Sequence, residues 1–310
     1  MSNSCRKAFS DTILELAKSD SSIQVLCTDS RGSALLNEYA EKLPEQFVEV
    51  GIAEQNCLGM AAGLANVGMK PFAVGPASFY TARSAEQLKV DIAYSNSNVK
   101  VIGISGGVSY GALGATHHSI QDIAFTRAIH NLSVLLPCDA AQTAAMTRVL
   151  AEYKGPVYMR FGRGSVPDVY EKTPEFTIGK ANILRQGANA AIIAAGEMVY
   201  PSIKAADLLL KKGIEVKVID MCSIKPLDEE AVLDAAKTGF VITVEEHSVY
   251  GGLGAAVAEV IVQKTEARMK IMGIPDTHVV TGSSQEVFDY YSLTPAGIAK
   301  NALAMIEGKK

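Results

Sequence analysis

Short apolar runs alternate along the chain with longer segments in which apolar residues recur at helical spacing. In the first half the apolar runs are IQVLCTD, FVEVG, KPFAVG, VKVIGIS, LSVLLP and PVYMRF. Strands of a parallel sheet that is covered on both faces are apolar along their whole length, and the helices between them cover those faces. The pattern therefore predicts an α/β fold with a mostly parallel sheet between two layers of helices.

The alternation is interrupted between Gly164 and Gly187, where prolines and glycines stand among polar residues. It then resumes in the apolar runs NAAIIAAG, IEVKVID and GFVITVEE. Such a break is typical of a crossing between domains. We predict two tandem three-layer α/β/α domains, the second smaller than the first, with residues 1–165 and 188–310 as domains and residues 166–187 as the linker.

Polar residues and glycines mark several helix ends. Asp139 precedes Gln142 and Ser119 precedes Asp122 at the spacing at which a side-chain oxygen accepts from a first-turn amide. Two helical segments of the second domain, YPSIKAADLLLKKG and KPLDEEAVLDAAKTG, each stop at a glycine. A left-handed C-terminal cap requires such a glycine.

Composition and charge exclude several classes of protein. The chain has 310 residues, 29 Lys and Arg against 33 Asp and Glu, and a net charge of -4. It has no basic run that would bind nucleic acid or an anionic membrane, and no apolar run long enough to span a bilayer. The five cysteines are scattered without a CxxC pair, which argues against disulfides and a zinc site. We expect a soluble cytoplasmic protein without a targeting segment.

A glutamate begins a helix that is otherwise almost entirely apolar. Glu54 follows the strand FVEV and a tight turn, within the stretch EVGIAEQNCLGMAAGLANVG. An acidic residue in a first turn often does no more than complement the helix dipole. In apolar surroundings, however, a carboxyl has a raised pKa and can act as a proton donor or shuttle.

Three further segments carry candidate chemistry. A glycine-rich loop, SGGVSYGALGATHHSIQD, follows a strand and brings His117 and His118 to a helix start, although adjacent histidines there are often surface or packing residues.

Arg160 and Arg163 bracket a strand end and suit an anionic group, although isolated arginines are mostly solvated. In EEHSVYGGLG, His247 and three glycines precede a helix of the second domain, and close packing of that helix on a strand is the better explanation of the glycines. The glycine spacing does not match a dinucleotide-binding motif, and no GxSxG motif occurs.

Six motifs together resemble the C-terminal half of transketolases. They are VEVGIAEQNCLGMAAGLA, GALGATHHSIQDIAFTR, LLPCDAAQT, GPVYMRFGRG, IDMCSIKPLD and VEEHSVYGGLGAAVAE, in the family's order and spacing. The chain looks like the separate small subunit of a split transketolase, and the resemblance covers roughly residues 5 to 305. Deoxyxylulose phosphate synthases and the β subunits of 2-oxoacid dehydrogenases share the same two domains.

The resemblance implies that the first domain binds the aminopyrimidine ring of thiamine diphosphate. The GDG motif that binds the diphosphate through Mg2+ is absent from the chain. A partner subunit is therefore expected to carry that domain and the Mg2+ ligands, in an α2β2 heterotetramer whose active sites lie between subunits. By the same resemblance, Glu54 hydrogen-bonds a pyrimidine nitrogen and Phe79 stacks on the ring, while Pro76 and Ala82 replace aromatic residues of the pocket.

The resemblance also assigns the substrate pocket. His117 matches a histidine that contacts sugar hydroxyls and helps proton transfer. Arg6, Ser33 and Arg163 match the pocket for the terminal phosphate, with Arg160 as the alternative to Arg163. A sulfonate has similar shape and charge and fits such donors equally well.

Two positions depart from full-length transketolases. Ser105 stands where those enzymes carry a histidine, and Leu113 where they carry an aspartate that reads a sugar hydroxyl. The departures argue against the usual pentose phosphates and favour an unusual ketose phosphate or sulfonate.

The function predicted from sequence is transfer of a two-carbon ketol unit from a ketose to an aldose. A deoxyxylulose phosphate synthase-like subunit, a 2-oxoacid dehydrogenase β-like subunit and a non-catalytic scaffold homologue are the alternatives. The sequence does not identify the sugars, the pathway or the role of the C-terminal domain.

Overall fold

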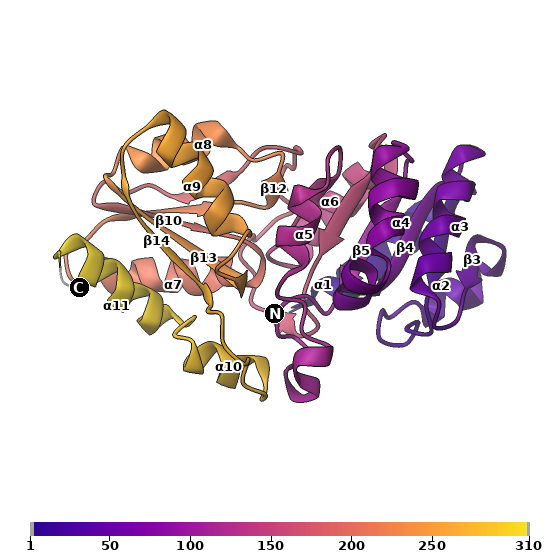
Figure 1. Ribbon diagram of the computed structural model, residues 1–310, viewed down its shortest axis with the longest axis horizontal. Coiled ribbons are helices and arrows are strands. Elements are labelled where there is room, and N and C mark those ends of the chain that lie inside the picture. Colours follow the sequence, from indigo (N-terminus) through magenta and orange to yellow (C-terminus); the bar gives the residue numbers. More distant parts are fainter. Residues whose placement is uncertain (1–2, 309–310) are drawn as a thin grey trace.

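The computed structural model describes residues 3–308 (Figure 1). Its strands, in chain order, are β1 (Asn3–Ser4), β2 (Ile23–Cys27), β3 (Phe47–Glu49), β4 (Lys70–Pro76), β5 (Lys100–Ile104), β6 (Ser133–Leu135), β7 (Val157–Arg160), β8 (Ser165–Val166), β9 (Asn182–Arg185), β10 (Ala190–Ala194), β11 (Val216–Asp220), β12 (Ser223–Lys225), β13 (Phe240–Ser248) and β14 (Arg268–Ile274).

The α-helices are α1 (Cys5–Ala17), α2 (Asn37–Lys42), α3 (Glu54–Asn66), α4 (Ala85–Gln87), α5 (Asp122–Ala128), α6 (Ala140–Glu152), α7 (Val199–Leu210), α8 (Glu229–Ala236), α9 (Leu253–Lys264), α10 (Ser284–Tyr290) and α11 (Pro295–Ile306). The 3-10 helices are η1 (Pro44–Gln46), η4 (Gly111–Thr116) and η5 (Gly196–Met198), and two π-helical turns are η2 (Phe79–Arg83) and η3 (Leu88–Tyr94).

Two mostly parallel sheets organise the chain. Within residues 3–308, seven strands form the first sheet in the order β12-β6-β7-β5-β4-β2-β3, and five form the second in the order β14-β13-β10-β11-β9. Antiparallel pairing occurs only at one edge of each of these sheets, through β12 and β9, among the described residues. The prediction of parallel sheets is thus confirmed, and the apolar runs of the sequence correspond to central strands of the sheets and to the edge strand β3.

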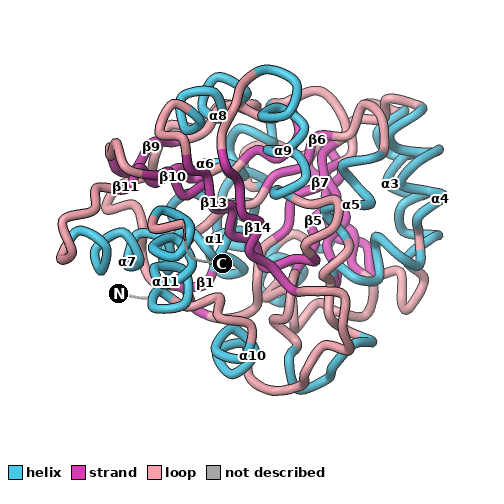
Figure 2. The backbone as a smooth tube through the Cα atoms, turned by 60° about the vertical axis from the view of Figure 1, so that its left-hand side comes forward, coloured by secondary structure: helices cyan, strands magenta, loops and turns pink. Residues whose placement is uncertain are grey.

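Helices cover both faces of each sheet, as predicted. In the first domain α1 packs against α6, and α3 packs against β4 and η3. In the second domain α7 packs against α11, and α8 against α9. Figure 2 shows the α7–α11 pair and the α8–α9 pair on opposite sides of the second sheet. Among residues 3–308 no helix combines the length and the apolar character needed to cross a membrane.

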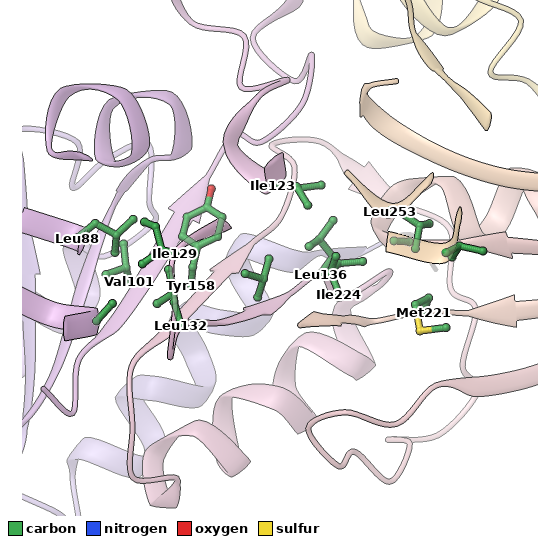
Figure 3. Close-up of a cluster of buried hydrophobic side chains, with 14 of the residues drawn as sticks. Leu88, Val101, Ile123, Ile129, Leu132, Leu136, Tyr158, Met221, Ile224 and Leu253 are labelled. Carbon is green, nitrogen blue, oxygen red and sulfur yellow. The ribbon is translucent and has the colours of Figure 1, made fainter. Parts of the chain in front are cut away.

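The two halves of the chain share one hydrophobic cluster. Figure 3 shows it running from Leu88, Val101 and Tyr158 of the first half to Met221 and Leu253 of the second. In addition, β12 lies after the second sheet's β11 in sequence but pairs with β6 of the first sheet. The two domains are therefore joined by buried apolar surface and by β12, a strand from the second half of the chain that belongs to the first sheet.

The segment predicted as a linker contains regular structure at both ends. Residue Val166 belongs to β8, which pairs with β1, and β9 at residues Asn182–Arg185 is the edge strand of the second sheet. The division at residues 165 and 188 stays a prediction.

The predicted helix ends agree with the structure except at one position. Asp139 accepts from the Gln142 amide at 2.8 Å, and Gly213 and Gly239 have positive φ of 76° and 79° after α7 and α8. The cap at Ser119 was wrong, because α5 begins at Asp122 after Gln121 and the buried Ser119 hydroxyl has no partner among the described residues.

Candidate functional site

The predicted site residues follow the carboxyl ends of adjacent strands of the first sheet. Ser33 follows β2, Glu54 follows β3, and Phe79 follows β4; His117 and Arg163 come after β5 and β7. Since β7, β5, β4, β2 and β3 are neighbours and parallel, these segments emerge at the same edge. The short β1–β8 pair then places Arg6, at the start of α1, near Arg163.

Glu54 is the first residue of α3 and is almost completely buried, with 2% of its surface exposed. The sequence predicted purely apolar surroundings for its carboxylate, but the structure places a charged group beside it. The Arg83 guanidinium donates to Glu54 Oε2 at 2.8 Å. The apolar setting is therefore corrected to a buried carboxylate with one cationic partner.

Arg83 is a site residue that the sequence reading missed. Its Cζ lies 4.4 Å from the centroid of the Phe79 ring, so the guanidinium both stacks on Phe79 and binds Glu54. It stands at the end of the π-helical turn η2, which the sequence did not reveal. The one sequence feature that could have indicated Arg83 is its spacing of four residues from Phe79.

A cavity of about 680 Å³ opens beside this group. Phe79, Arg83, His118 and Phe125 are among the residues that line it. The hydroxyl of Ser78, in the same lining, is buried without a hydrogen-bond partner within residues 3–308. Burial lowers the pKa of His118, which favours the neutral imidazole. The cavity thus combines an aromatic face with hydrogen-bonding groups that have room for a ligand.

His117 lies between two aromatic rings. Its ring centroid is 5.3 Å from that of Phe79 and 5.4 Å from that of Tyr110, both in edge-on geometry. Its Nδ1 is 2.9 Å from the Thr116 hydroxyl. The structure therefore brings His117 next to Phe79, as the resemblance requires, and adds Tyr110, which sequence reasoning did not select.

The predicted anion-binding residues also come together. Arg6 donates to the backbone oxygens of Ser33 and Arg163, the latter at 2.6 Å. Burial, followed by the charge of Arg163, lowers the pKa of Arg6. The Arg163 guanidinium lies with Cζ 4.6 Å from the Tyr110 ring centroid. Two arginines held this close leave positive charge for an anionic group to neutralise.

Arg160 is corrected from a candidate ligand to a structural residue. Its side chain is 4% exposed and donates to Ser119 O and Asp122 Oδ1, each at 2.9 Å. It also donates to the Glu246 backbone oxygen. An arginine whose guanidinium bonds are made inside the protein has little left for a substrate, so the structure favours Arg163 for the anion.

Two carboxyls of the second domain reach the glycine-rich loop and the Arg163 segment. Glu246 accepts from the Val108 amide at 2.7 Å, and a Cβ at Gly107, whose φ is +60°, would lie 2.1 Å from Glu246. A Cβ at Gly162 would lie 1.5 Å from Glu197. These glycines therefore make room for interdomain carboxyls. Burial raises the pKa of both Glu197 and Glu246.

His247 is a packing residue in the structure. It is fully buried, with Nδ1 at 2.7 Å from Ser248 O and Nε2 accepting from the Ala124 amide at 3.3 Å. Burial lowers the pKa of His247 to about 4, so the neutral ring bridges the two halves of the chain.

Three remaining residues singled out from the sequence lie at the ends of β4 and β5 and in η4. Pro76 is the buried last residue of β4 and is not among the residues lining the 680 Å³ cavity. Ser105, directly after β5, has a positive φ of 57° and a buried hydroxyl without a partner in the described part of the chain. Leu113 is 54% exposed in η4.

Comparison with known proteins agrees with the fold. Residues 2–169 match the family described as transketolase, pyrimidine binding domain, and residues 179–298 match the transketolase C-terminal domain. An apulose-4-phosphate transketolase subunit of Phocaeicola vulgatus is 54% identical over 305 residues, 98% of this chain and 97% of that one.

A second relative is the 6-deoxy-6-sulfo-D-fructose transketolase subunit SqwH of a Clostridium species. It is 35% identical, covering 98% of this chain and 95% of its own. A solved structure described as a split gene transketolase, inactive beta4 tetramer, has 35% identity and a TM-score of 0.90 over the full length of both chains.

A pyrimidine-binding α/β domain followed by a smaller α/β domain defines the C-terminal section of a thiamine diphosphate-dependent enzyme. The chain belongs to the transketolase family, and it matches the separate small subunits of split transketolases over nearly their whole length. The family and fold predicted from sequence are confirmed.

The residues at the site suit an aminopyrimidine. Glu54 supplies a buried hydrogen-bonding carboxyl, while Phe79 and Ser78, which both line the neighbouring cavity, supply an aromatic face and a hydroxyl without a partner in the described part of the chain. Within residues 3–308, no group of three or more His, Cys, Asp or Glu side chains is arranged to hold a metal ion.

Proposed function

We propose that this chain is the catalytic small subunit of a split transketolase, which moves a two-carbon ketol unit from an anionic ketose to an aldose. The observation that carries the proposal is one connected group of side chains. Glu54 and Arg83 lead through Phe79 to His117, and from there through Tyr110 to Arg163. A cofactor end and an anion end are thereby held in a single site.

Thiamine diphosphate, when bound, supplies the carbanion chemistry that breaks and forms the carbon–carbon bond. The residues of this chain bind and orient it. Glu54 would hydrogen-bond the pyrimidine ring, and Phe79 would stack on that ring. Arg83 contacts both of these residues. When the pyrimidine ring binds, the Arg83 side chain would therefore have to move away or contact Glu54 and Phe79 alongside the ring.

His117 would move the proton of the sugar hydroxyl at the other side of Phe79. An imidazole is suited to this role because its ring nitrogens can both accept and donate a proton. The His117 ring is held by Thr116 at Nδ1 and by the rings of Phe79 and Tyr110. These three side chains are uncharged.

A partner subunit would complete the active site with the diphosphate-binding domain and the Mg2+ ligands. Apolar side chains are exposed around α3 and η3, where Ile52 is 75%, Val67 73% and Tyr94 75% exposed. Large apolar side chains that are exposed on a domain can mark a protein interface. We propose an α2β2 heterotetramer formed through this surface, in a reducing cytoplasm that suits the free buried cysteines.

The substrates would be phosphorylated or sulfonated sugars. Arg163 and Arg6 supply the positive charge, and relatives are named for a ketose phosphate and for a sulfonated ketose. Leu113 and Ser105 leave the pocket with fewer groups that read sugar hydroxyls than the resemblance would give.

Product analysis tests this function against its alternatives. The chain would be assembled with its partner, thiamine diphosphate and Mg2+, and offered ketose phosphates and sulfonates with aldose acceptors, or pyruvate with an aldose phosphate. We expect ketol transfer from a ketose. Formation of a 1-deoxy ketose from pyruvate would instead support a deoxyxylulose phosphate synthase-like subunit, and oxidative decarboxylation a 2-oxoacid dehydrogenase β-like subunit.

A further inference from the structure

Tyr110 connects the two ends of the site. It immediately precedes η4 in the glycine-rich loop and is half-buried. Its ring meets His117 edge-on, with centroids 5.4 Å apart and ring planes at 76°, and it lies under the Arg163 guanidinium at 4.6 Å. Its hydroxyl is 3.5 Å from Ser33 Oγ. One side chain thus contacts three residues of the proposed substrate pocket.

The contact with Arg163 uses the face of the guanidinium and leaves its edge free. Among residues 3–308 the Arg163 side chain has no ion pair, and its guanidinium packs on the Tyr110 ring. All guanidinium N–H groups lie in the plane of the group, so stacking on an aromatic ring does not consume them. Tyr110 therefore holds the arginine while its donors remain available to an anion.

The backbone of Arg163 is fixed separately. Arg6 donates to the Arg163 carbonyl oxygen at 2.6 Å and also to the Ser33 carbonyl oxygen. The position of the chain at Arg163 is therefore set by Arg6, whereas the direction of the Arg163 side chain is set by Tyr110.

We propose that Tyr110 is a positioning residue that fixes the distance between the anion-binding guanidinium of Arg163 and the imidazole of His117. Through that distance it selects ketoses whose terminal phosphate or sulfonate lies the right number of carbons from the ketol group. This inference rests on the proposed function for its substrate. The orientation of Arg163 by the Tyr110 ring is tested without the substrate.

A packing role and a positioning role of Tyr110 predict different results. If Tyr110 only fills space, replacing it lowers the melting temperature and leaves anion binding unchanged. If its ring orients Arg163, loss of the ring weakens anion binding even in a variant that melts normally. Phenylalanine keeps the ring and removes the hydroxyl, so Tyr110→Phe is the matched control for Tyr110→Leu.

The experiment uses the full chain and inorganic phosphate as the probe. The rise in melting temperature with phosphate, over chloride of equal ionic strength, reports its dissociation constant. We expect the wild type and Tyr110→Phe to bind phosphate alike, Tyr110→Leu to bind it about tenfold more weakly, and Arg163→Ala to lose the effect. Tyr110→Met replaces the leucine variant if that variant does not fold.

Equal phosphate binding by the wild type and Tyr110→Leu would overturn the proposal, and so would a wild type that does not respond to phosphate. Equal weakening in Tyr110→Phe would also overturn it, because it would assign the effect to the hydroxyl. In the assembled enzyme, Tyr110→Leu should raise KM for an anionic ketose more than for its uncharged counterpart, and Tyr110→Phe should not. Ketol transfer by the wild type is measured separately, so failure of this inference leaves the proposed function standing.

Discussion

The Arg83 guanidinium donates to the buried Glu54 carboxylate at 2.8 Å. Glu54 is 2% exposed, whereas the Arg83 side chain is 46% exposed, so the pair joins a buried anion to a cation that reaches the surface. The same guanidinium stacks on Phe79. Glu54 therefore has a charged neighbour at the position where the cofactor ring is proposed to bind.

Removal of Arg83 should destabilise the protein, because it leaves a buried carboxylate without its partner. We expect Arg83→Ala to lower the free energy of unfolding by about 1–3 kcal/mol, measured by urea titration at neutral pH. Arg83→Ala combined with Glu54→Gln should recover part of the loss. The control is Arg148→Ala, which breaks the exposed pair with Glu15 and should cost less than about 1 kcal/mol. If Arg83→Ala and Arg148→Ala lose the same free energy of unfolding, the buried Arg83–Glu54 pair stabilises the protein no more than an exposed pair does.

Glu54→Gln should slow cofactor activation in the assembled enzyme. The measurement is exchange of the thiazolium carbon-bound proton of thiamine diphosphate with deuterated solvent. Because glutamine cannot provide the proton-transferring carboxyl, we expect exchange to slow by about 100-fold or more. Glu86→Gln, on the exposed surface of α4, serves as the control and should exchange at the wild-type rate. Unchanged exchange in Glu54→Gln would remove Glu54 from the mechanism.

Arg163 and Arg160 should give opposite results when each is replaced by alanine. Arg163→Ala should raise KM for phosphorylated or sulfonated ketoses and leave KM for uncharged analogues and the melting temperature nearly unchanged. Arg160→Ala removes the partner of buried Asp122 and should lower the free energy of unfolding by about 3–5 kcal/mol. A substrate-specific KM effect in a stable Arg160→Ala variant would reverse the two assignments.

The interdomain carboxyls should make stability depend on pH. Burial raises the pKa of Glu197 from 4.5 to about 7 and that of Glu246 to about 8. The folded state thus holds these protons more tightly than the unfolded state. Their contribution to stability is full below pH 4.5 and is lost as pH rises through about 7 to 8.

Thermal unfolding measured at a series of pH values from 4.5 to about 8 tests whether Glu197 and Glu246 cause this loss of stability. The wild type should lose melting temperature as pH rises, and Glu197→Gln should lose less, because the amide does not titrate. Glu245, whose pKa is raised to about 7 by burial, contributes in the same direction and should leave a residual slope. A slope in Glu197→Gln as steep as in the wild type would contradict the assignment.

The sequence predicted most of the fold because apolar runs mark buried strands. The strands from β2 to β7, and β10, β11 and β13, coincide with runs of the sequence, whereas β1, β8, β9, β12 and β14 were not foreseen. Of these, β9, β12 and β14 lie at edges of the two large sheets, and β1 and β8 form a separate pair. An edge strand lacks hydrogen bonds on one side and often has a weaker apolar signal, although the edge strand β3 was foreseen. The pairing of β12 with the first sheet depends on contacts between distant segments, which a local pattern cannot show.

At the site, the sequence located the residues proposed here to carry the chemistry, but it missed two residues that contact them. Glu54, His117 and Arg163 were found through motifs. Arg83 and Tyr110 were missed, because an arginine on a π-helical turn and a tyrosine in a glycine-rich loop have no distinctive local pattern. Arg160 and Arg163 could not be separated by sequence, since only their three-dimensional partners show which guanidinium is already bound.

Partner dependence is the central claim, and a titration measures it most directly. A fixed amount of this chain, with thiamine diphosphate, Mg2+ and substrates in excess, would be mixed with increasing amounts of the subunit that carries the diphosphate-binding domain, and ketol transfer would be followed. We predict no transfer without the partner and a rate that rises to a plateau at equimolar subunits. Full transfer by this chain alone would contradict the account.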